Sequence, residues 1–327
     1  MMFVEDKLCN KSSKIVIIDT DAGIDDAWAI LMLLAASQSE NVSVAGITCV
    51  HGNAEVDQIC LNVLRTLEAS KRPDIPVFKG ASSPIIEVDP HFKNSWRPFF
   101  GADGFGCAEH KSMPDPRFVQ EENGIVALNR LVNENKGNVS LLCFGPLTNV
   151  ALAIRTFPSF EENLKEVLIM GGNYMAVGNS TNCAEFNFHF DPEAAYIVLN
   201  SAIKRKVLVP WETCCHLAYS LEWRDNVLGS CQNGGVQLLN HVERPLRIKP
   251  SFVDWVACDQ AVAAIFLDPT VACEIDNVFA TVELHGQHTR GQVVVGHKFK
   301  REPNLAIVKS IDKERFTELL LKVHTLK

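Results

Sequence analysis

The sequence predicts an α/β protein with three layers, in which helices flank a mainly parallel central sheet and a β-hairpin follows near the C-terminus. Three observations support this prediction. β-Branched apolar runs alternate with segments of helical length. The apolar runs are continuous, as in Val139–Cys143, which indicates strands buried on both faces. A length of 327 residues, with 47% hydrophobic and 21% charged residues, fits one domain over residues 1–327.

The elements can be placed along the chain in order. After an N-terminus over residues 1–13 that we expect to be flexible, strand Lys14–Ile18 and helix Asp25–Ala36 form the first unit, joined by an acidic turn. The same alternation recurs, so we expect further strands and helices at Val42–Thr48, Glu55–Glu68, Val139–Phe144, Asn149–Arg155, Val167–Met170 and Lys206–Val209.

The C-terminal part completes the predicted fold. Val278–Leu284 and Gly291–Val295 flank a polar turn and predict the hairpin, and Asp312–Val323 predicts a final helix. Asp191-Pro192 and Asp268-Pro269 each place a carboxylate before a proline, which is typical of a helix start or of a sharp stop. Three stretches lack a regular pattern, and we expect them to be long functional or mobile connections: residues 85–116, 171–190 and 216–253.

Composition argues against several classes of partner. The formal charge of −8 leaves no basic face for a nucleic-acid backbone. The longest apolar run, Ala27–Ala36, is too short to span a bilayer, and Met1–Ser13 lacks the apolar core of a secretory signal, so we expect a cytoplasmic location without membrane attachment. The eleven cysteines have no regular spacing and are interpreted as reduced thiols, including the adjacent pair Cys214 and Cys215.

Four carboxylates, Asp19, Asp21, Asp25 and Asp26, surround a glycine turn directly after the first strand. Like charges this close repel one another, and a cation or shared protons must compensate them if they are buried. Oxygen ligands favour calcium or magnesium over zinc. Capping of the following helix could explain Asp25 and Asp26, but it does not explain all four carboxylates.

The run Asp19–Asp26 resembles the N-terminal metal motif of the inosine-uridine preferring nucleoside hydrolases, with Ala22 where that family usually has proline. The similarity continues in the family's order along nearly the whole chain. Its further motifs are Gly52-Asn53, Phe144–Asn149, Met170–Gly172, Gly178-Asn179, Ala184–Asn187, Asp191–Ala195, Cys258–Ala263 and Thr289–Gly291.

The resemblance implies calcium-dependent hydrolysis of the N-glycosidic bond of a ribonucleoside. It implies that the carboxylates of Asp21, Asp26 and Asp259 and the main-chain carbonyl of Phe144 bind Ca²⁺. Asp21 is also the expected general base, because calcium lowers the pKa of water only modestly. Asp19 is expected to support the neighbouring carboxylates.

The resemblance further implies a set of residues that bind the sugar of the nucleoside, and an assembly that is a homodimer or a homotetramer. Asn and carboxylate side chains suit a ribose, which both donates and accepts hydrogen bonds. For Asn179 a role in a turn is the simpler alternative, since Gly178-Asn179 is a turn dipeptide. The expected substrate-binding residues are Asp25, Asn53, Met170, Asn179, Glu185 and Asn187.

Activation of the leaving base is where the sequence departs most from the family. Phe100 and Cys258 stand where many members have histidine, which indicates a different subgroup. The base could leave by stacking on an aromatic side chain, with a proton from solvent or from a loop. The leaving-group candidates are His241, Trp255 and Cys258; further aromatic candidates are Trp223, Phe186 and Phe188, and Arg244 and Arg247 are near in sequence.

Two other functions compete with this hypothesis. Asp19-Thr20-Asp21 after a strand also resembles magnesium-dependent aspartyl phosphatases, in which Asp19 would be the nucleophile. That fold needs a later lysine and an acidic pair, and no comparable pair is evident. A relative that binds nucleosides without catalysis is the second alternative, suggested by the missing histidines and by Ala22.

Overall fold

A nine-stranded sheet forms the middle of the protein in the computed structural model, which describes residues 13–87, 99–250, 252–298 and 301–327. Eight of its strands are parallel, and only β10 at one edge runs antiparallel to its neighbour β13. The strands, in sheet order, are β10 (Ala272–Val278), β13 (Leu305–Ile311), β7 (Lys206–Val209), β6 (Glu166–Met170), β5 (Val139–Cys143), β1 (Lys14–Thr20), β2 (Val42–Cys49), β3 (Val77–Lys79) and β4 (Val119–Gln120).

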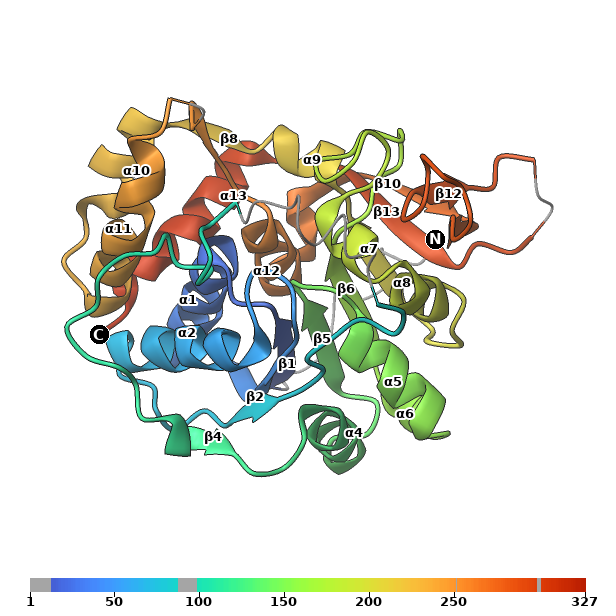
Figure 1. Cartoon of the computed structure of the whole chain (residues 1–327), viewed down its shortest axis with the longest axis horizontal. Coiled ribbons are helices and arrows are strands. Elements are labelled where there is room, and N and C mark those ends of the chain that lie inside the picture. The colour runs from blue at the N-terminus through green and yellow to red at the C-terminus, as the bar shows by residue number, and fades with distance from the viewer. Residues whose placement is uncertain (1–12, 88–98, 251, 299–300) are drawn as a thin grey trace.

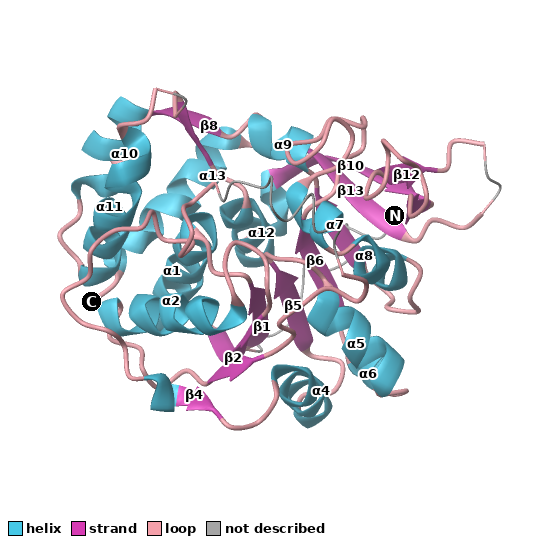
Figure 2. Cartoon of the chain, in the orientation of Figure 1, coloured by secondary structure: helices cyan, strands magenta, loops and turns pink. Residues whose placement is uncertain are grey.

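Helices cover both faces of this sheet, which confirms the predicted three-layer sandwich (Figure 1). Figure 2 shows the central strands between the two sets of helices. One face carries α1 (Ile24–Ser39), α2 (Val56–Ala69), α11 (Gly234–Arg247), α12 (Asp259–Leu267) and α13 (Lys313–Leu320). The other carries α4 (Gly124–Glu134), α5 (Thr148–Thr156), α6 (Phe160–Asn163) and α8 (Pro192–Leu199).

The alternation of side chains along β1 shows why its sequence is continuously apolar. Val16 and Ile18 pack into the core beneath α1, whereas Ile17 packs into the core beneath α4 and α5. Helix α1 is itself enclosed by the sheet, α11 and α12, so nearly all of its residues from Ile24 to Ala36 are buried. The apolar run Ala27–Ala36 is therefore a buried helix, and no helix among the described residues is long and apolar enough to cross a bilayer.

Several local predictions are confirmed. The hairpin consists of β11 (Ala280–Val282) and β12 (Val293–Val295), which pair antiparallel. Asp191 begins α8, because its carboxylate accepts a hydrogen bond from the Ala194 amide at 3.0 Å. Asp312 caps α13 in the same way. The N-terminal residues 1–12 lie outside the described residues, so the expected flexibility there stays a prediction.

The structure differs from the sequence-based expectation in several regions, two of which are in the C-terminal half. Residues 305–311 were assigned no strand, yet β13 joins the central sheet beside β7. The stretch 216–253 was expected to be irregular, but it contains β8 (Ala218–Ser220), α10 (Leu221–Asn226) and α11, and β8 pairs with β9 (Asp254–Val256). The Gly234-Gly235 pair opens α11 and allows close packing against Ala69 and Leu31.

Candidate active site

A cavity of about 660 Å³ opens at the carboxyl ends of four neighbouring parallel strands. Asp21 follows β1, Phe144 follows β5, Met170 ends β6, and Trp211 follows β7 at the start of α9 (Trp211–Cys215). Ligand sites of parallel sheets form at this edge because the connections after the strands diverge there. All of the predicted metal-binding and substrate-binding residues line this one cavity: Asp21, Asp25, Asp26, Asn53, Phe144, Met170, Asn179, Glu185, Asn187 and Asp259.

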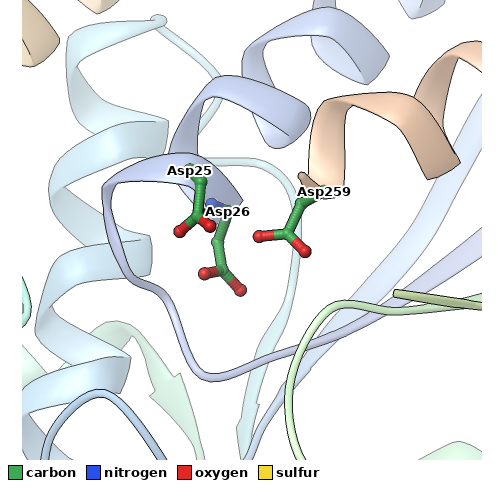
Figure 3. A group of neighbouring side chains, drawn as sticks. All are labelled: Asp25, Asp26 and Asp259. Carbon is green, nitrogen blue, oxygen red and sulfur yellow. Dashed lines mark hydrogen bonds between the residues drawn. The ribbon is translucent and has the colours of Figure 1, made fainter. Parts of the chain in front are cut away.

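The acidic part of the cavity lies between the first turns of two helices. Asp25 and Asp26 begin α1 and Asp259 begins α12, and their side chains point toward one another (Figure 3). One carboxylate oxygen of each lies within 4.8 Å of the others. Asp25 thus occupies this compact group, although sequence reasoning assigned it to the sugar and assigned Asp21 to the metal. Both side chains line the cavity.

The hydrogen bonds within this group leave oxygens available to a cation. Asp26 accepts hydrogen bonds from the Thr20 hydroxyl and, at 2.9 Å, from the Gly23 amide. Asp259 Oδ1 is buried and has no hydrogen-bond partner among the described residues. Buried polar atoms rarely stay unpaired in folded proteins. An all-oxygen site with an unpaired buried carboxylate oxygen fits a hard cation such as calcium or magnesium.

Asp21 is held next to the acidic group by main-chain contacts. Its Oδ2 accepts a hydrogen bond from the Asn53 amide at 2.8 Å, and only 1% of the residue is exposed. Two glycines pack against its carboxylate. A Cβ at Gly52 would lie 2.1 Å from Oδ2, and one at Gly145 would lie 2.8 Å from Oδ1. The glycines of the Gly52-Asn53 and Phe144–Asn149 motifs therefore make room for this side chain.

Burial and mutual repulsion disfavour the ionised carboxylates. Burial raises the pKa of Asp21 and of Asp25 well above the ordinary value, and the charge of Asp26 raises both further. Burial also raises the pKa of Asp259, with Asp25 adding to the effect. The pKa of Asp26 rises less far, because hydrogen bonds from Thr20 and Gly23 oppose the burial. A positive charge among these groups would lower the pKa values again and favour the ionised carboxylates.

Asp19 links neighbouring elements of the fold and does not line the cavity. It is fully buried, does not line the cavity, and accepts hydrogen bonds from the Thr48 hydroxyl and from Asn149 Nδ2 at 2.7 Å. These contacts join β1, β2 and the start of α5. Burial raises the pKa of Asp19 to about 7. Because Asp19 is fully buried and does not line the cavity, the structure argues against the alternative that makes it a phosphatase nucleophile.

Asn187 connects the ends of two strands beside the acidic group. Its Nδ2 donates to the carbonyl of Phe144 at 2.7 Å and to that of Met170 at 3.2 Å, while its buried Oδ1 has no hydrogen-bond partner among the described residues. The Phe144 carbonyl, the predicted metal ligand, is thus an accepting group at the cavity wall. The side chain of Asn187 fixes its position.

Glu185 anchors the loop that follows β6. Its carboxylate begins α7 (Phe186–Phe190) and accepts hydrogen bonds from the amides of Gly172, Asn187 and Phe188. Gly172 has a φ of +62°, and a Cβ there would lie 2.8 Å from Val293, so this turn requires glycine. Burial raises the pKa of Glu185 to about 7, although the three amide donors lower it.

Asn53 and Asn179 occupy the rim of the cavity. Asn53 is half-buried next to Gly23, in the turn before α1. Asn179 is exposed, and its Oδ1 accepts a hydrogen bond from the Phe186 amide at 2.8 Å. This hydrogen bond closes the loop after β6, so the side chain has the turn role that was the simpler alternative. The same residue also lines the cavity.

Besides its carboxylates and amides, the cavity is lined by many aromatic and aliphatic residues. Trp255 lines it, as predicted, and so does Cys258, whose thiol is buried. Cys214 and burial raise the pKa of the Cys258 thiol well above its ordinary value, so it is no reactive thiolate. The apolar lining residues are Ile24, Phe99, Phe100, Phe144, Met170, Phe186, Trp211, Leu246, Phe252, Trp255, Val256 and Cys258.

Several leaving-group candidates lie elsewhere. His241 is exposed on α11, and its Nε2 contacts the carbonyl of Glu109 at 2.6 Å. Trp223 stacks on Tyr219, with ring centroids 4.1 Å apart, and does not line the cavity. Phe188 is fully buried against Gly171 and Gly172. Arg244 and Arg247 also do not line the cavity. Among the described residues, no histidine lines it.

Sequence reasoning missed part of this lining. Trp211 lies two residues after the end of β7, a position that could have identified it, because the other strand ends carry site residues. Glu243 and Leu246 lie on α11, inside the stretch that was expected to be irregular. Phe252 lies near the end of the same stretch and Asp254 begins β9 just after it, and no local motif marks any of these four residues.

Comparisons with known proteins agree with this arrangement. The sequence model of the inosine-uridine preferring nucleoside hydrolases matches residues 16–318. The chain belongs to this family. Family membership identifies the chain as a hydrolase that acts on N-glycosidic bonds.

Individual nucleoside hydrolases extend the similarity along the chain. The pyrimidine-specific ribonucleoside hydrolase RihA of Salmonella paratyphi B is 33% identical over 317 residues, which cover 93% of this chain and 96% of that protein. The probable uridine nucleosidase 2 of Oryza sativa subsp. japonica is 39% identical over 188 residues, or 57% of this chain and 53% of that protein. A solved inosine-guanosine nucleoside hydrolase has a TM-score of 0.85 and 30% identity, covering 96% of this chain and 99% of that one.

Proposed function

We propose that this protein hydrolyses the N-glycosidic bond of ribonucleosides in a calcium-dependent reaction, releasing ribose and the free base. One observation supports the proposal: a single cavity is lined by the buried carboxylates Asp21, Asp26 and Asp259, here called its acidic end, and by aromatic side chains such as Trp211 and Trp255, here called its aromatic end. A nucleoside has the matching polarity, since its ribose is rich in hydroxyl groups and its base is a flat ring. The cavity volume of about 660 Å³ is in the range of small-molecule sites.

The acidic end suits the ribose. Asp25, Asn53 and Asn187 offer oxygens and amide hydrogens at the cavity wall, and Asn187 Oδ1 is an unpaired buried acceptor for a sugar hydroxyl. Breaking the bond leaves positive charge on the ribose, which the surrounding carboxylates stabilise more strongly than they stabilise the neutral substrate. The carboxylates repel one another, and the positive charge of the transition state relieves this repulsion.

Asp21 is the proposed general base. The oxygen of a water molecule bonds to C1′ of the ribose, and Asp21 accepts the proton that this water loses. The bond between C1′ and the base nitrogen breaks, and its electron pair leaves with the base. The Asn53 amide and the close approach of Gly52 and Gly145 hold the Asp21 carboxylate in one orientation for this step.

The residues that would hold calcium are Asp21, Asp26, Asp259 and the carbonyl of Phe144, with Asp25 near enough to join them. When bound, the ion would supply the positive charge that these carboxylates need at neutral pH and would lower the pKa of a neighbouring water modestly. Magnesium satisfies the same oxygen donors less readily, because it demands a stricter octahedral geometry. Calcium accepts more oxygen ligands and a less regular geometry, so we propose calcium for this carboxylate set.

The departing base is expected to stack between aromatic side chains and to take its proton from solvent. Trp211, Trp255 and Phe186 offer ring faces or edges at the cavity wall. The named relatives differ in their substrates: one is called pyrimidine-specific and another acts on inosine and guanosine. Aromatic rings can stack on either kind of base, so we propose that the enzyme accepts purine and pyrimidine ribonucleosides.

A panel of nucleosides tests this function. The purified protein is incubated with inosine, guanosine, adenosine, uridine and cytidine, and released ribose is measured with and without a calcium chelator. We expect ribose release that the chelator stops and that added calcium restores. Binding of nucleosides by the calcium-loaded protein without ribose release from any of them would instead support a non-catalytic relative.

A further inference from the structure

We propose that Glu243 and Arg224 are a positioning pair that fixes the ring of Trp255 as one wall of the nucleobase subsite. The inference rests on the proposed function and deepens it, because it identifies what orients the aromatic end of the cavity. Glu243 and Trp255 both line the cavity, whereas Arg224 lies behind Glu243 and is fully buried.

One carboxylate collects three hydrogen bonds at this point. Glu243 Oε1 accepts from the indole Nε1 of Trp28 at 2.7 Å and from that of Trp255 at 3.1 Å. Its Oε2 accepts from Arg224 Nε at 2.7 Å. The guanidinium of Arg224 also lies 4.8 Å from the ring centroid of Trp28 and bonds to Asn240 at 2.8 Å. Only 1% of Glu243 is exposed, so these contacts replace its hydration.

Trp255 needs such an anchor because its own strand supplies little. Strand β9 spans three residues and pairs only with β8, outside the central sheet. Val253, two positions earlier, is 72% exposed. The Trp255 ring packs edge to face with Trp28 at 6.1 Å and against Tyr219 at 6.0 Å, and its Nε1 hydrogen bond to Glu243 sets the direction in which the indole N–H points. Without an acceptor there, the ring loses the contact that selects one orientation.

The same carboxylate connects the aromatic end to the acidic end. Trp28 lies on α1, two residues after Asp26, and it is fully buried. Glu243 therefore relates the wall contributed by β9 to the helix that presents Asp25 and Asp26. The distance between Trp255 on β9 and the carboxylates on α1 sets where a base can lie relative to the sugar. A base held at the wrong distance would place C1′ away from Asp21.

Glu243 is a positioning residue and not the acid that protonates the base. Both of its oxygens accept hydrogen bonds, and its ion pair with Arg224 is buried. It thus offers no proton to a leaving base, although it is a carboxylate at the aromatic end. Its effect on turnover must pass through the position of Trp255 and Trp28.

Removing the pair without leaving a buried charge gives the sharpest test. The double variant Glu243→Met/Arg224→Met replaces both charged groups by apolar side chains of similar length, which folded proteins often tolerate. We expect the inhibition constants of free hypoxanthine, adenine and uracil and the KM of their nucleosides to rise by about tenfold, as for a lost stacking contact. The inhibition constant of D-ribose should change by less than about twofold, and kcat should fall less than KM rises.

A second measurement reports the ring directly. Two indoles in edge-to-face contact produce coupled near-ultraviolet circular dichroism bands, and the double variant should lose the Trp28 and Trp255 contribution. The conservative variant Glu243→Gln keeps one oxygen acceptor for the indoles, so base inhibition should stay within about threefold of the parent. If Glu243→Gln does not fold because Arg224 is left unpaired, the double variant and its dichroism still decide the question.

A matched control separates positioning from general loss of a buried carboxylate. Glu166 is 5% exposed, pairs with Arg205 at 2.7 Å and begins β6, at the opposite end of that strand from the cavity. Glu166→Gln should reduce stability and leave all inhibition constants unchanged.

Unchanged base inhibition in the folded double variant, or an equal rise for base and ribose, would overturn the inference. Failure of the parent protein to release ribose would instead reject the proposed function, and base titrations would still test the pair.

Discussion

The two ends of the cavity are built in different ways. The acidic end consists of residues that directly follow strands or begin helices, so short segments such as Asp19–Asp26 define it. The aromatic end combines residues from α9, α11 and β9 with loop residues such as Phe100, which are far apart in the sequence. The residues proposed to act on the glycosidic bond therefore lie at one edge of the sheet, while the surrounding helices and loops supply the residues proposed to contact the base. The reaction can stay constant in such a fold while the substrate changes.

The largest expected effect concerns the base at the acidic end. Asp21→Ala should lower kcat by about three orders of magnitude, because the attacking water then has no proton acceptor. Ribose release from inosine or uridine measures the loss, and circular dichroism verifies the fold. Asp57→Ala removes an exposed carboxylate that pairs only with Lys79, so it serves as the control and should keep full activity. Parental turnover in Asp21→Ala would refute the assigned role.

Metal removal should affect the two ends unequally. At a calcium concentration of 100 times Kd, binding stabilises the folded protein by about 3 kcal/mol, which a chelator should abolish. The chelator should also stop ribose release and weaken the binding of D-ribose, whereas binding of the free base should persist; tryptophan fluorescence measures both. The free energy of unfolding is measured by denaturant titration with calcium, magnesium or neither. Equal loss of ribose and base binding would show that the ends are not independent.

A backbone position tests how closely the acidic end is packed. A Cβ at Gly52 would lie 2.1 Å from Asp21 Oδ2, so Gly52→Ala must displace the general base. A displacement of this kind should lower kcat by about a hundredfold, without changing inhibition by the free base. Gly137→Ala is the matched control, since no atom lies within 4 Å of a Cβ there and its cost comes from a φ of +72°. Unaltered kcat in Gly52→Ala would mean that Asp21 moves without consequence.

The same contrast explains how far the sequence could predict the site. The run Asp19–Asp26 predicted a metal-type cluster because all four carboxylates are within one turn of a strand end. The Glu243 carboxylate gave no such signal, since one of its partners, Trp28, is 215 positions away. Its helix was also hidden by Gly234-Gly235 and Pro245, residues that usually interrupt helices. Strand β13 was missed because its pairing with β7 and β10 is a long-range contact.

The smallest expected effect is on stability, at the loop between the two ends. Burial raises the pKa of Glu185 from 4.5 to about 7, so the folded state favours the protonated form. Its contribution to stability is then complete below about pH 4.5 and is lost as the pH rises through about 7. Glu185→Gln cannot titrate, so from pH 4 to pH 8 the difference in unfolding free energy should shift by about 3 kcal/mol in favour of the variant.

The informative quantity is how the difference in unfolding free energy between parent and variant changes with pH. Its absolute value is less useful, because the glutamine side chain also loses hydrogen bonds at every pH. Glu185 accepts from three amides, and a glutamine oxygen can replace only part of this set, so the variant should be less stable than the parent at pH 4. Denaturant titrations at several pH values, with Glu68→Gln as the exposed control, give the slopes. Parallel profiles for Glu185→Gln and the parent would show that the three amides keep Glu185 ionised, and that the loop after β6 is held by a permanent carboxylate.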